Sequence, residues 1–505
     1  MNRRLLAAWA ALLLVTLFAW RENLALGFTD VDAWADVAWA GQPWGEQLFA
    51  PLTGGVGGGN ANFWRPVVML HYKLLRSLFG LDPVGWQAWD LGLHLCCVGL
   101  LGRLAGGWRG LVAGAIFALH PLQVEVVPAV ARNIDSLLGV WTLLALLAAR
   151  RGSWAGTVAA CLLALGTKET AIAVIPVVWL WWRSHRHEGS WPLAAVLVAS
   201  ITGYLMARDQ VLMGVGGYGT DLLDPEGFFR PFAAAPVACF FPGWSLPLEA
   251  LFTHWGAQLA LGLLVLASLV GGLWLRRREP LDWLGLAAWG LPLVLYGMTS
   301  TYSRRLLYVP LIGLALLFSG WALHRGLRWG LAAVLLSMLP HTVLIHGHDW
   351  ALNDQVTISL TTGAEQGLRQ APEGARIWIM DRCVRLPHDM ARARTWGGGK
   401  SLNNCVASYS VQAWADDVVG RAQDFVLLDL CYPNEPLDTP VVRIEGEDLV
   451  VDRRIAGRRF YEKSREAGWQ ITSGEGTVRL RYTGERQDDH LLIASGGASV
   501  LVRVP

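Results

Sequence analysis

The chain has 505 residues, of which 53% are hydrophobic and only 16% are charged, and its net charge at pH 7 is +2. A soluble domain carries about 25% charged residues, so this composition argues against a soluble protein and for one that lipid solvates in large part. The 27 Trp residues agree, because Trp favours the membrane–water interface. No basic stretch interleaved with aromatic residues is present, so the sequence indicates no nucleic-acid partner.

Eleven hydrophobic segments predict a polytopic α-helical membrane protein, because a spanning helix needs about 20 apolar residues. The predicted spans are residues 4–20, 87–104, 109–127, 134–149, 153–167, 169–183, 191–207, 255–275, 282–298, 306–322 and 329–346. The first could be a signal peptide, but no small-residue cleavage site follows Trp20, so we expect an uncleaved helix. Residues 232–247 are apolar but contain three prolines and are a candidate for a twelfth, shallower element.

Basic residues between the segments predict the orientation. Thirteen arginines fall in alternate, short connections: Arg3, Arg4, Arg103, Arg109, Arg150, Arg151, Arg183, Arg186, Arg276, Arg277, Arg278, Arg325 and Arg328. Because cytoplasmic loops carry the excess of Lys and Arg, the N-terminus is expected to be cytoplasmic and the C-terminal tail extracytoplasmic. Cysteine use and the uncleaved first helix fit an integral protein of a bacterial inner membrane, with a periplasmic or extracellular tail, and an endomembrane stays open as the alternative.

The chain divides into two predicted domains. Residues 1–349 form the membrane domain, with long outer loops at 21–86 and 208–254, and residues 350–505 form an extracytoplasmic α+β domain. In the tail, apolar runs and period-two alternation predict strands at 375–381, 424–430, 476–483 and 498–504, and helices are expected at 409–421 and 458–467. Cys383, Cys405 and Cys431 lie in this tail, where one disulfide could form if it is extracytoplasmic, and the three pairings stay open.

The first candidate site residues are Asp30 and Asp32, just after the first span. Residues i and i+2 of an extended segment lie on one face, so one carboxylate could accept a proton while the other orients it or holds a cation. The alternative is an ordinary solvated loop.

A second candidate group lies in the outer turn between the third and fourth spans. His120, Glu125, Arg132 and Asp135 crowd this short connection. Ionisable groups at membrane depth cost about 2.5–3.5 kcal/mol each, so they are rarely idle. The alternative is a cluster of caps and ion pairs that only fixes the helical hairpin.

Two further groups come later in the chain. Lys168 and Glu169 interrupt an apolar stretch. They could belong to a loop that reaches the membrane surface, and the alternative is a simple turn. Arg304 and Arg305 open the tenth span from the arginine-poor side, shortly before Tyr308. Guanidinium groups suit phosphate oxygens, and the alternative is snorkelling to lipid headgroups. Asp90 and His94 are four residues apart and are expected to share a helix face. They could form a polar contact between helices or belong to the site.

Ordered short motifs carry a resemblance to a known family. They are Trp64-Arg65-Pro66, Leu78-Phe79-Gly80-Leu81-Asp82-Pro83, His94, Phe117-Ala118-Leu119-His120-Pro121, Val124-Glu125, Arg132, Asp135-Ser136-Leu137, Lys168-Glu169 and Arg305-Leu306-Leu307-Tyr308-Val309-Pro310. This set resembles GT-C-type membrane glycosyltransferases, in particular the O-mannosyltransferase branch whose other members carry tetratricopeptide repeats. No such repeat is evident in this tail.

The resemblance implies a GT-C-like fold and inverting sugar transfer from a polyprenyl-phosphate donor on the extracytoplasmic face. The family's first acidic motif usually has two adjacent acids, whereas here Val31 separates Asp30 from Asp32. Asp30 is then the expected general base with Asp32 as its partner. Arg65, His120, Glu125, Arg132, Lys168, Glu169, Arg304, Arg305 and Tyr308 are the expected substrate-binding residues.

The function that we expect is sugar transfer to a protein or glycan acceptor within a lipid bilayer. No cofactor is expected to be required, and a divalent metal stays open. The alternatives are a non-catalytic flippase for lipid-linked sugars, a component of polysaccharide export, and a receptor or scaffold whose outer domain is the working part.

Overall fold

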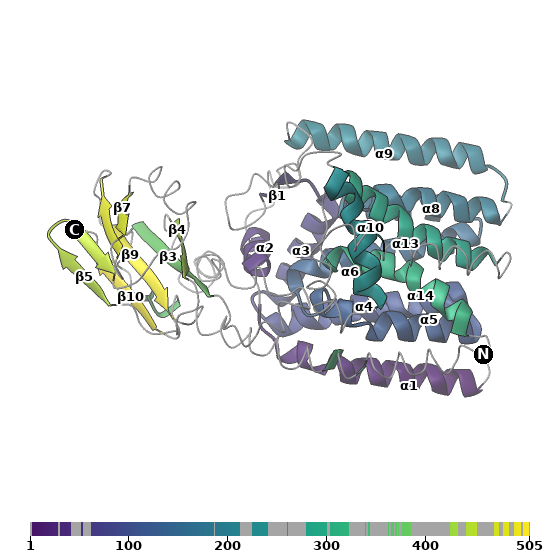
Figure 1. Cartoon of the computed structure of the whole chain (residues 1–505), viewed down its shortest axis with the longest axis horizontal. Helices are drawn as coiled ribbons and strands as arrows, with labels where there is room; N and C mark the ends of the chain where they lie inside the picture. Colours follow the sequence, from purple (N-terminus) through teal and green to yellow (C-terminus); the bar gives the residue numbers. More distant parts are fainter. Residues whose placement is uncertain are drawn as a thin grey trace.

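The structure is a computed structural model that places a bundle of helices from the first two thirds of the chain beside strands from the last third (Figure 1). The residues that it describes are 3–28, 31–41, 52–53, 62–185, 187–212, 225–240, 260, 279–299, 304–322, 339, 342–343, 362, 365–367, 369–370, 372, 376–384, 425–432, 441–451, 469–473, 478–483, 489–495 and 498–503.

Most of the described helices follow the apolar segments of the sequence closely. They are Arg3–Ala19 (α1), Val31–Gly41 (α2), Pro66–Phe79 (α3), Pro83–Ala105 (α4), Gly107–Leu119 (α5), Asn133–Arg150 (α6), Trp154–Thr167 (α7), Ala171–Ser184 (α8), Ser190–Leu212 (α9), Pro225–Phe240 (α10), Pro280–Met298 (α13) and Tyr308–Ala322 (α14). Four 3-10 helices lie between them, at Arg21–Ala25 (η1), Pro121–Glu125 (η3), Val130–Arg132 (η4) and Arg304–Leu307 (η5).

Among the described residues, four helical stretches are long and apolar enough to cross a membrane. They are Pro83–Ala105, Val130–Arg150, Ser190–Leu212 and Pro280–Met298. Shorter apolar helices accompany them at Gly107–Leu119, Trp154–Thr167, Ala171–Ser184 and Arg305–Gly320. The predicted helical membrane class is therefore confirmed, whereas the count of eleven spans stays a prediction.

The centre of the bundle is α6, and α9 lies at its rim. Within the most apolar stretch of each, 83% of residues are buried for Val130–Arg150 but only 17% for Ser190–Leu212. Large apolar side chains of α9, such as Trp191, Val198 and Met206, are exposed and suit a lipid environment. Glycine lets α13 and α14 pack backbone against backbone, because a Cβ at Gly285 would come within 2.7 Å of the Gly313 carbonyl oxygen.

Two sequence predictions differ from the structure in extent. The predicted span 109–127 is too long, because α5 ends at Leu119 and Pro121 begins η3, where a proline suits the first turn of a new helix. The segment predicted as a loop over 21–86 contains η1, α2 and α3, and α3 escaped notice because it is short and carries polar residues such as His71 and Lys73. Most of the predicted spans 255–275 and 329–346 lies outside the described residues.

The segment 21–86 also holds a two-stranded pairing. Strands Leu52–Thr53 (β1) and Asn62–Phe63 (β2) run antiparallel. The residue Trp64 and the N-cap of α3, Arg65, follow directly after β2. The hairpin therefore leads the chain to the start of α3, where the candidate site begins.

The described part of the tail forms two four-stranded sheets. One has the order β10-β9-β3-β4 and the other β5-β6-β8-β7. The strands are Arg376–Val384 (β3), Phe425–Tyr432 (β4), Val442–Glu445 (β5), Asp448–Val451 (β6), Trp469–Ser473 (β7), Val478–Tyr482 (β8), Asp489–Ser495 (β9) and Ala498–Arg503 (β10). The predicted helices 409–421 and 458–467 lie outside the described residues, and the domain boundary at 349/350 stays a prediction.

Candidate functional site: a charged cluster at one end of the bundle

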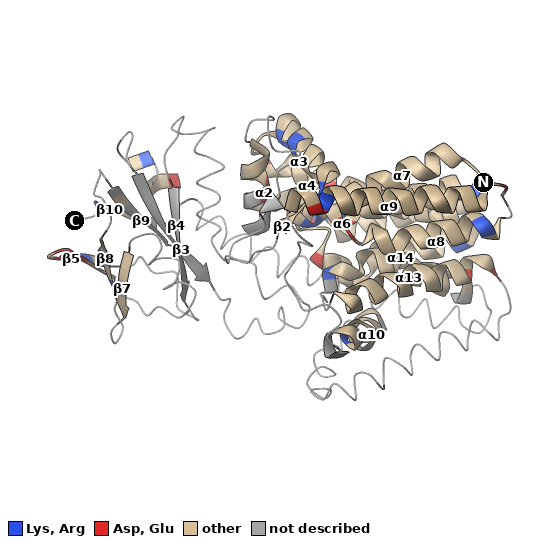
Figure 2. Ribbon diagram, turned by 90° about the horizontal axis from the view of Figure 1, so that it is seen from above, with Lys and Arg blue, Asp and Glu red and all other residues tan. Residues whose placement is uncertain are grey.

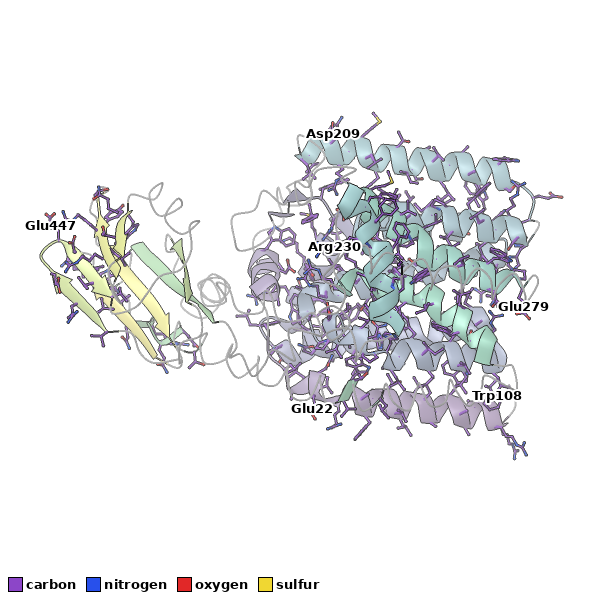
Figure 3. The ribbon with its side chains drawn as sticks, viewed as in Figure 1. Glu22, Trp108, Asp209, Arg230, Glu279 and Glu447 are labelled. Atoms are coloured by element: carbon purple, nitrogen blue, oxygen red, sulfur yellow. The ribbon has the colours of Figure 1, made fainter. Side chains whose placement is uncertain are left out.

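Charged side chains of the bundle gather at its two ends, and the helix walls between them are largely uncharged (Figure 2). In Figure 3, Glu22 and Asp209 mark one end, and Trp108 and Glu279 mark the other. We call the first the cluster end, where α6 and α8 begin and α7, α9 and α13 finish, and the second the opposite end. The two ends differ in how their charges are paired.

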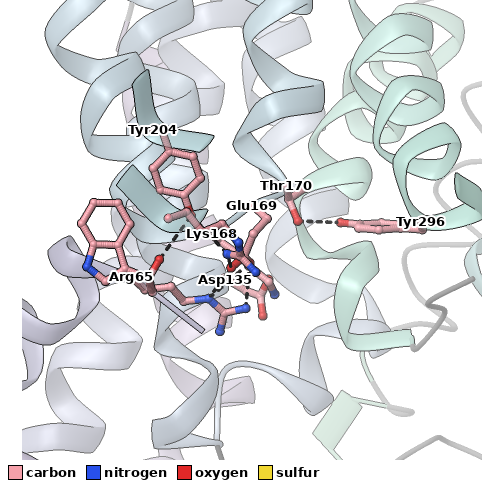
Figure 4. Close-up of polar contacts among 9 residues, drawn as sticks. Arg65, Asp135, Lys168, Glu169, Thr170, Tyr204 and Tyr296 are labelled. Atoms are coloured by element: carbon pink, nitrogen blue, oxygen red, sulfur yellow. Dashed lines mark hydrogen bonds and ion pairs between the residues drawn. The ribbon is translucent and has the colours of Figure 1, made fainter. Parts of the chain in front are cut away.

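At the cluster end, Glu169 holds two arginines from different elements. Arg65, at the start of α3, donates to Glu169 through Nη2 at 2.8 Å and Nε at 3.3 Å (Figure 4). Arg208, near the end of α9, also forms an ion pair with Glu169. Burial alone would raise the pKa of Glu169, but the two guanidinium groups lower it to about 2. Glu169 is therefore ionised, and its side chain keeps 24% of its exposure.

The neighbouring residue, Lys168, forms a second ion pair. Its ammonium contacts the Asp135 carboxylate in the first turn of α6, and the two side chains are only 8% and 3% exposed. Burial lowers the pKa of Lys168 to about 8, although Asp135 opposes the change. The pair links two groups that the sequence analysis treated separately: the turn after His120 and the Lys168–Glu169 connection.

Close packing of α3 on α7 brings these residues together. A Cβ at Gly166 would come within 2.6 Å of the Val67 side chain, so glycine is needed for the helices to approach this closely. On the other side, the rings of Trp64 and Tyr204 stack with centroids 5.7 Å apart. The Tyr204 hydroxyl donates to the Trp64 carbonyl at 3.2 Å and lies 3.5 Å from Arg208 Nη1. The aromatic pair thus fixes the segment that carries Arg65 against α9.

A tyrosine on α13 connects the cluster to the segment that contains Arg305. The Tyr296 hydroxyl donates to the Leu306 carbonyl of η5 at 2.9 Å. It also lies 3.3 Å from Thr170 Oγ1 (Figure 4). Arg305 is half-buried and close enough to Lys168 to oppose its protonation electrostatically. The structure therefore gathers Arg65, Lys168, Glu169 and Arg305 at one place.

His120 and Tyr308 lie in a different environment. His120 is buried at the end of α5, where Nδ1 accepts from the Leu122 amide at 3.2 Å and Nε2 lies 2.9 Å from the Cys239 carbonyl oxygen. Burial lowers the pKa of His120 to about 4, so it is neutral at pH 7 and donates to Cys239. Tyr308 is buried, with its hydroxyl 3.0 Å from His94 Nδ1. These contacts join the end of α5 to α10, and α4 to α14.

The structure describes the other predicted site residues only in part. Glu125 ends η3 and is half-buried. Arg132 is the N-cap of α6. Burial and, to a smaller extent, Asp36 raise the pKa of Tyr72, and the nearby Arg132 opposes this rise. Asp32 lies in α2 and Arg304 begins η5, but their side chains are outside the described part, as is all of Asp30.

Sequence reasoning missed two members of the cluster and the role of a third. Arg208 and Tyr204 are four residues apart on one face of α9, and an arginine closing an apolar helix was the available signal. Asp135 was noted in the turn after His120, but its partner Lys168 is 33 residues away and no local pattern connects them. Among the described residues, no group of three or more His, Cys, Asp or Glu side chains could hold a metal ion.

The opposite end has a buried arginine of its own. Arg109 forms ion pairs with Glu279 and Asp282 and donates to the Leu316 carbonyl at 3.1 Å and the Ser319 hydroxyl at 3.4 Å. A cavity of about 290 Å³ lies at the same end, between the ends of α4, α6 and α8 and the start of α13. The cavity is therefore remote from the charged cluster.

Parts of the chain are similar in sequence to curated protein O-mannosyl-transferases. It is 33% identical over 132 residues to Tmtc1 of Drosophila melanogaster, which covers 24% of this chain and 15% of that protein. It is 31% identical over 113 residues to tmtc2 of Xenopus laevis, covering 21% of this chain and 13% of that protein. The predicted resemblance to this branch of glycosyltransferases is confirmed, but the chain spans less than a sixth of these relatives.

No family model matches the chain. Among solved structures, ArnT from Cupriavidus metallidurans in the apo state aligns over 94% of this chain and 98% of its own, at 13% identity and a TM-score of 0.42. ArnT bound to undecaprenyl phosphate aligns over 93% and 97%, at 14% identity and a TM-score of 0.39. At these scores the likeness does not establish a common fold.

Proposed function

We propose that this protein is an integral-membrane glycosyltransferase that takes a sugar from a polyprenyl-phosphate donor and transfers it, with inversion, to a protein or glycan acceptor. The observation that carries the proposal is the charged cluster, in which Arg65, Lys168 and Arg208 come together with Asp135 and Glu169 where apolar helices end. The partial similarity to protein O-mannosyl-transferases supports sugar transfer as the reaction.

The cluster suits the anionic part of such a donor. A sugar phosphate on a lipid has its phosphate at the membrane surface, where the tail enters the bilayer. Guanidinium groups bind phosphate oxygens through paired hydrogen bonds, and an ammonium adds a point charge. We assign Arg305 and Lys168 to the phosphate because they lie near one another at this end of the bundle, where Arg305 opposes the protonation of Lys168.

The reaction requires a base for the acceptor. In the proposed mechanism, the Asp30 carboxylate removes the proton of an acceptor hydroxyl as its oxygen attacks the anomeric carbon. The bond from that carbon to the phosphate oxygen breaks, and polyprenyl phosphate leaves with the electron pair. The cations stabilise the charge that develops on the leaving group.

A donor screen tests the proposal. Membranes that contain the protein are incubated with a panel of radiolabelled polyprenyl-phosphate sugars, and label in the acceptor fraction is measured. We expect transfer from one of these donors, and a loss of about 100-fold or more in Asp30→Asn, as for removal of a general base. The matched control is Asp209→Asn, the same change at an exposed position of the same end.

Transfer at the wild-type rate by Asp30→Asn would contradict the mechanism. Failure of every donor, together with movement of labelled lipid across reconstituted vesicles, would instead support the flippase alternative.

A further inference from the structure

Two of the three tail cysteines occupy matching positions on neighbouring strands. β3 and β4 run parallel, and their register pairs Ile377 with Phe425 at one end and Cys383 with Cys431 near the other. Directly paired residues of adjacent strands lie on the same face of a sheet. The third cysteine, Cys405, belongs to the segment between the strands and lies outside the described residues.

The backbone spacing at this position fits a disulfide bond. Adjacent strands are about 4.7–4.9 Å apart. A disulfide joins residues whose Cα atoms are about 4.4–6.8 Å apart, with both Cβ atoms on the same side. The register therefore satisfies the Cα distance and sets both cysteines on the same face of the sheet.

A disulfide at this position would stabilise the attachment of β4 to its sheet. β4 is at the edge of its sheet and pairs only with β3 among the described strands. The pairing is parallel, so it depends on a long crossover. Two residues before the cysteines, the same register sets Asp381 opposite Asp429, and like charges in that arrangement weaken a strand pair.

We propose that Cys383 and Cys431 form a disulfide bond. The two thiols lose two electrons and two protons as the S–S bond forms. A disulfide-bearing oxidoreductase accepts them by thiol–disulfide exchange and is reduced to its dithiol. Because such bonds persist in oxidising compartments, the bond places the tail on the face of the membrane opposite the cytoplasm. The proposal does not depend on the glycosyltransferase activity.

Peptide mapping of the full-length protein from its membranes tests the pairing. Free thiols are alkylated in denaturant and chelator without reductant, and the digest is examined by mass spectrometry before and after reduction. We expect a linked pair of peptides with Cys383 and Cys431 that separates on reduction, and an alkylated Cys405. The variant Cys405→Ser should keep the linked pair, whereas Cys383→Ser should leave Cys431 alkylated.

A bond that includes Cys405 would overturn the proposal, as would alkylation of all three cysteines without reductant. If Cys383→Ser does not accumulate, the wild-type protein and Cys405→Ser decide the question by themselves.

Discussion

The two ends of the helical bundle both bury cationic side chains, but they pair these charges differently. At the opposite end, one arginine, Arg109, faces the two carboxylates Glu279 and Asp282. At the cluster end, the two carboxylates Asp135 and Glu169 face Lys168, Arg65 and Arg208, and Arg305 lies near them.

This difference is one reason why we propose that the cluster end holds the binding site. The Arg109 guanidinium is fully engaged by acids, a carbonyl and a hydroxyl, so it joins α5 to α13 and α14 and has no need of a ligand. At the cluster end, the described ion pairs join Arg65 and Arg208 to Glu169 and Lys168 to Asp135, and Glu169 remains partly open to solvent.

The largest effect is expected from a substitution that removes the ion pairs of Arg109 at the opposite end. Arg109→Met leaves Asp282 buried without its cation, which should lower the free energy of unfolding by about 3–5 kcal/mol. Thermal unfolding in detergent measures this loss. Transfer per folded molecule should stay at the wild-type rate, because Arg109 is remote from the cluster. The control Arg103→Met alters an exposed arginine at the same end and should change stability by no more than about 0.5 kcal/mol.

The next effect is expected from Glu169→Gln, which removes the charge that holds Arg65 and Arg208. The two guanidinium groups then repel one another and shift, so kcat/KM for the donor should fall by about 100-fold. Glu188→Gln, the same change at an exposed residue of the opposite end, is the control. Equal kinetics for Glu169→Gln and wild type would remove the distinction between the two ends.

A smaller effect is expected from pH, through Lys168. Burial lowers the pKa of Lys168 to about 8 from an ordinary 10.5, so the ammonium loses its proton as the pH rises through 8. The donor KM should therefore rise several-fold between pH 7.5 and 9.5, and Lys168→Arg should remain flat because arginine stays protonated.

The free energy of unfolding should also depend on the titration of Lys168, and it should rise as the pH rises. Between pH 8 and 10.5 the unfolded chain binds more protons at Lys168 than the folded protein does, so the contribution of this residue to the free energy of unfolding rises with pH. A donor KM that does not change over this range would show that the Lys168 charge plays no part in binding.

The smallest effect is expected from Tyr204→Phe. The change keeps the ring that stacks on Trp64 and removes the hydroxyl that contacts the Trp64 carbonyl and Arg208. The loss should be about 1 kcal/mol in stability, as for one hydrogen bond, with less than a fivefold change in transfer. A loss as large as that of Glu169→Gln would mean that Tyr204 itself contacts the substrate.

Much of the bundle could be predicted because its signal is local. Apolar runs of helical length gave α4, α6, α9 and α13 within a few residues. α3 was missed because it lies along the end of the bundle as an amphipathic helix, with His71 and Lys73 among apolar residues.

The site was predicted only in pieces. Lys168, Glu169 and Arg305 were candidates because a charge that interrupts an apolar segment is visible in sequence, and Arg65 was a candidate through the family resemblance. Their partners were not visible: Arg65 and Glu169 are 104 residues apart, and their contact depends on how α3 packs against α7. His120 was also a candidate, but its polar atoms bond to backbone groups that only the folded chain brings near.

The central claim is that the cluster end binds the phosphate of the donor, and equilibrium binding of radiolabelled polyprenyl phosphate to the purified protein tests it most directly. Arg305→Gln should weaken binding by about 10–100-fold, equivalent to the 1.5–3 kcal/mol of a hydrogen bond to a charged group. Arg183→Gln, which changes an exposed arginine at the opposite end, should leave binding unchanged. Equal affinities for wild type and Arg305→Gln, or equal losses in the two variants, would contradict the account.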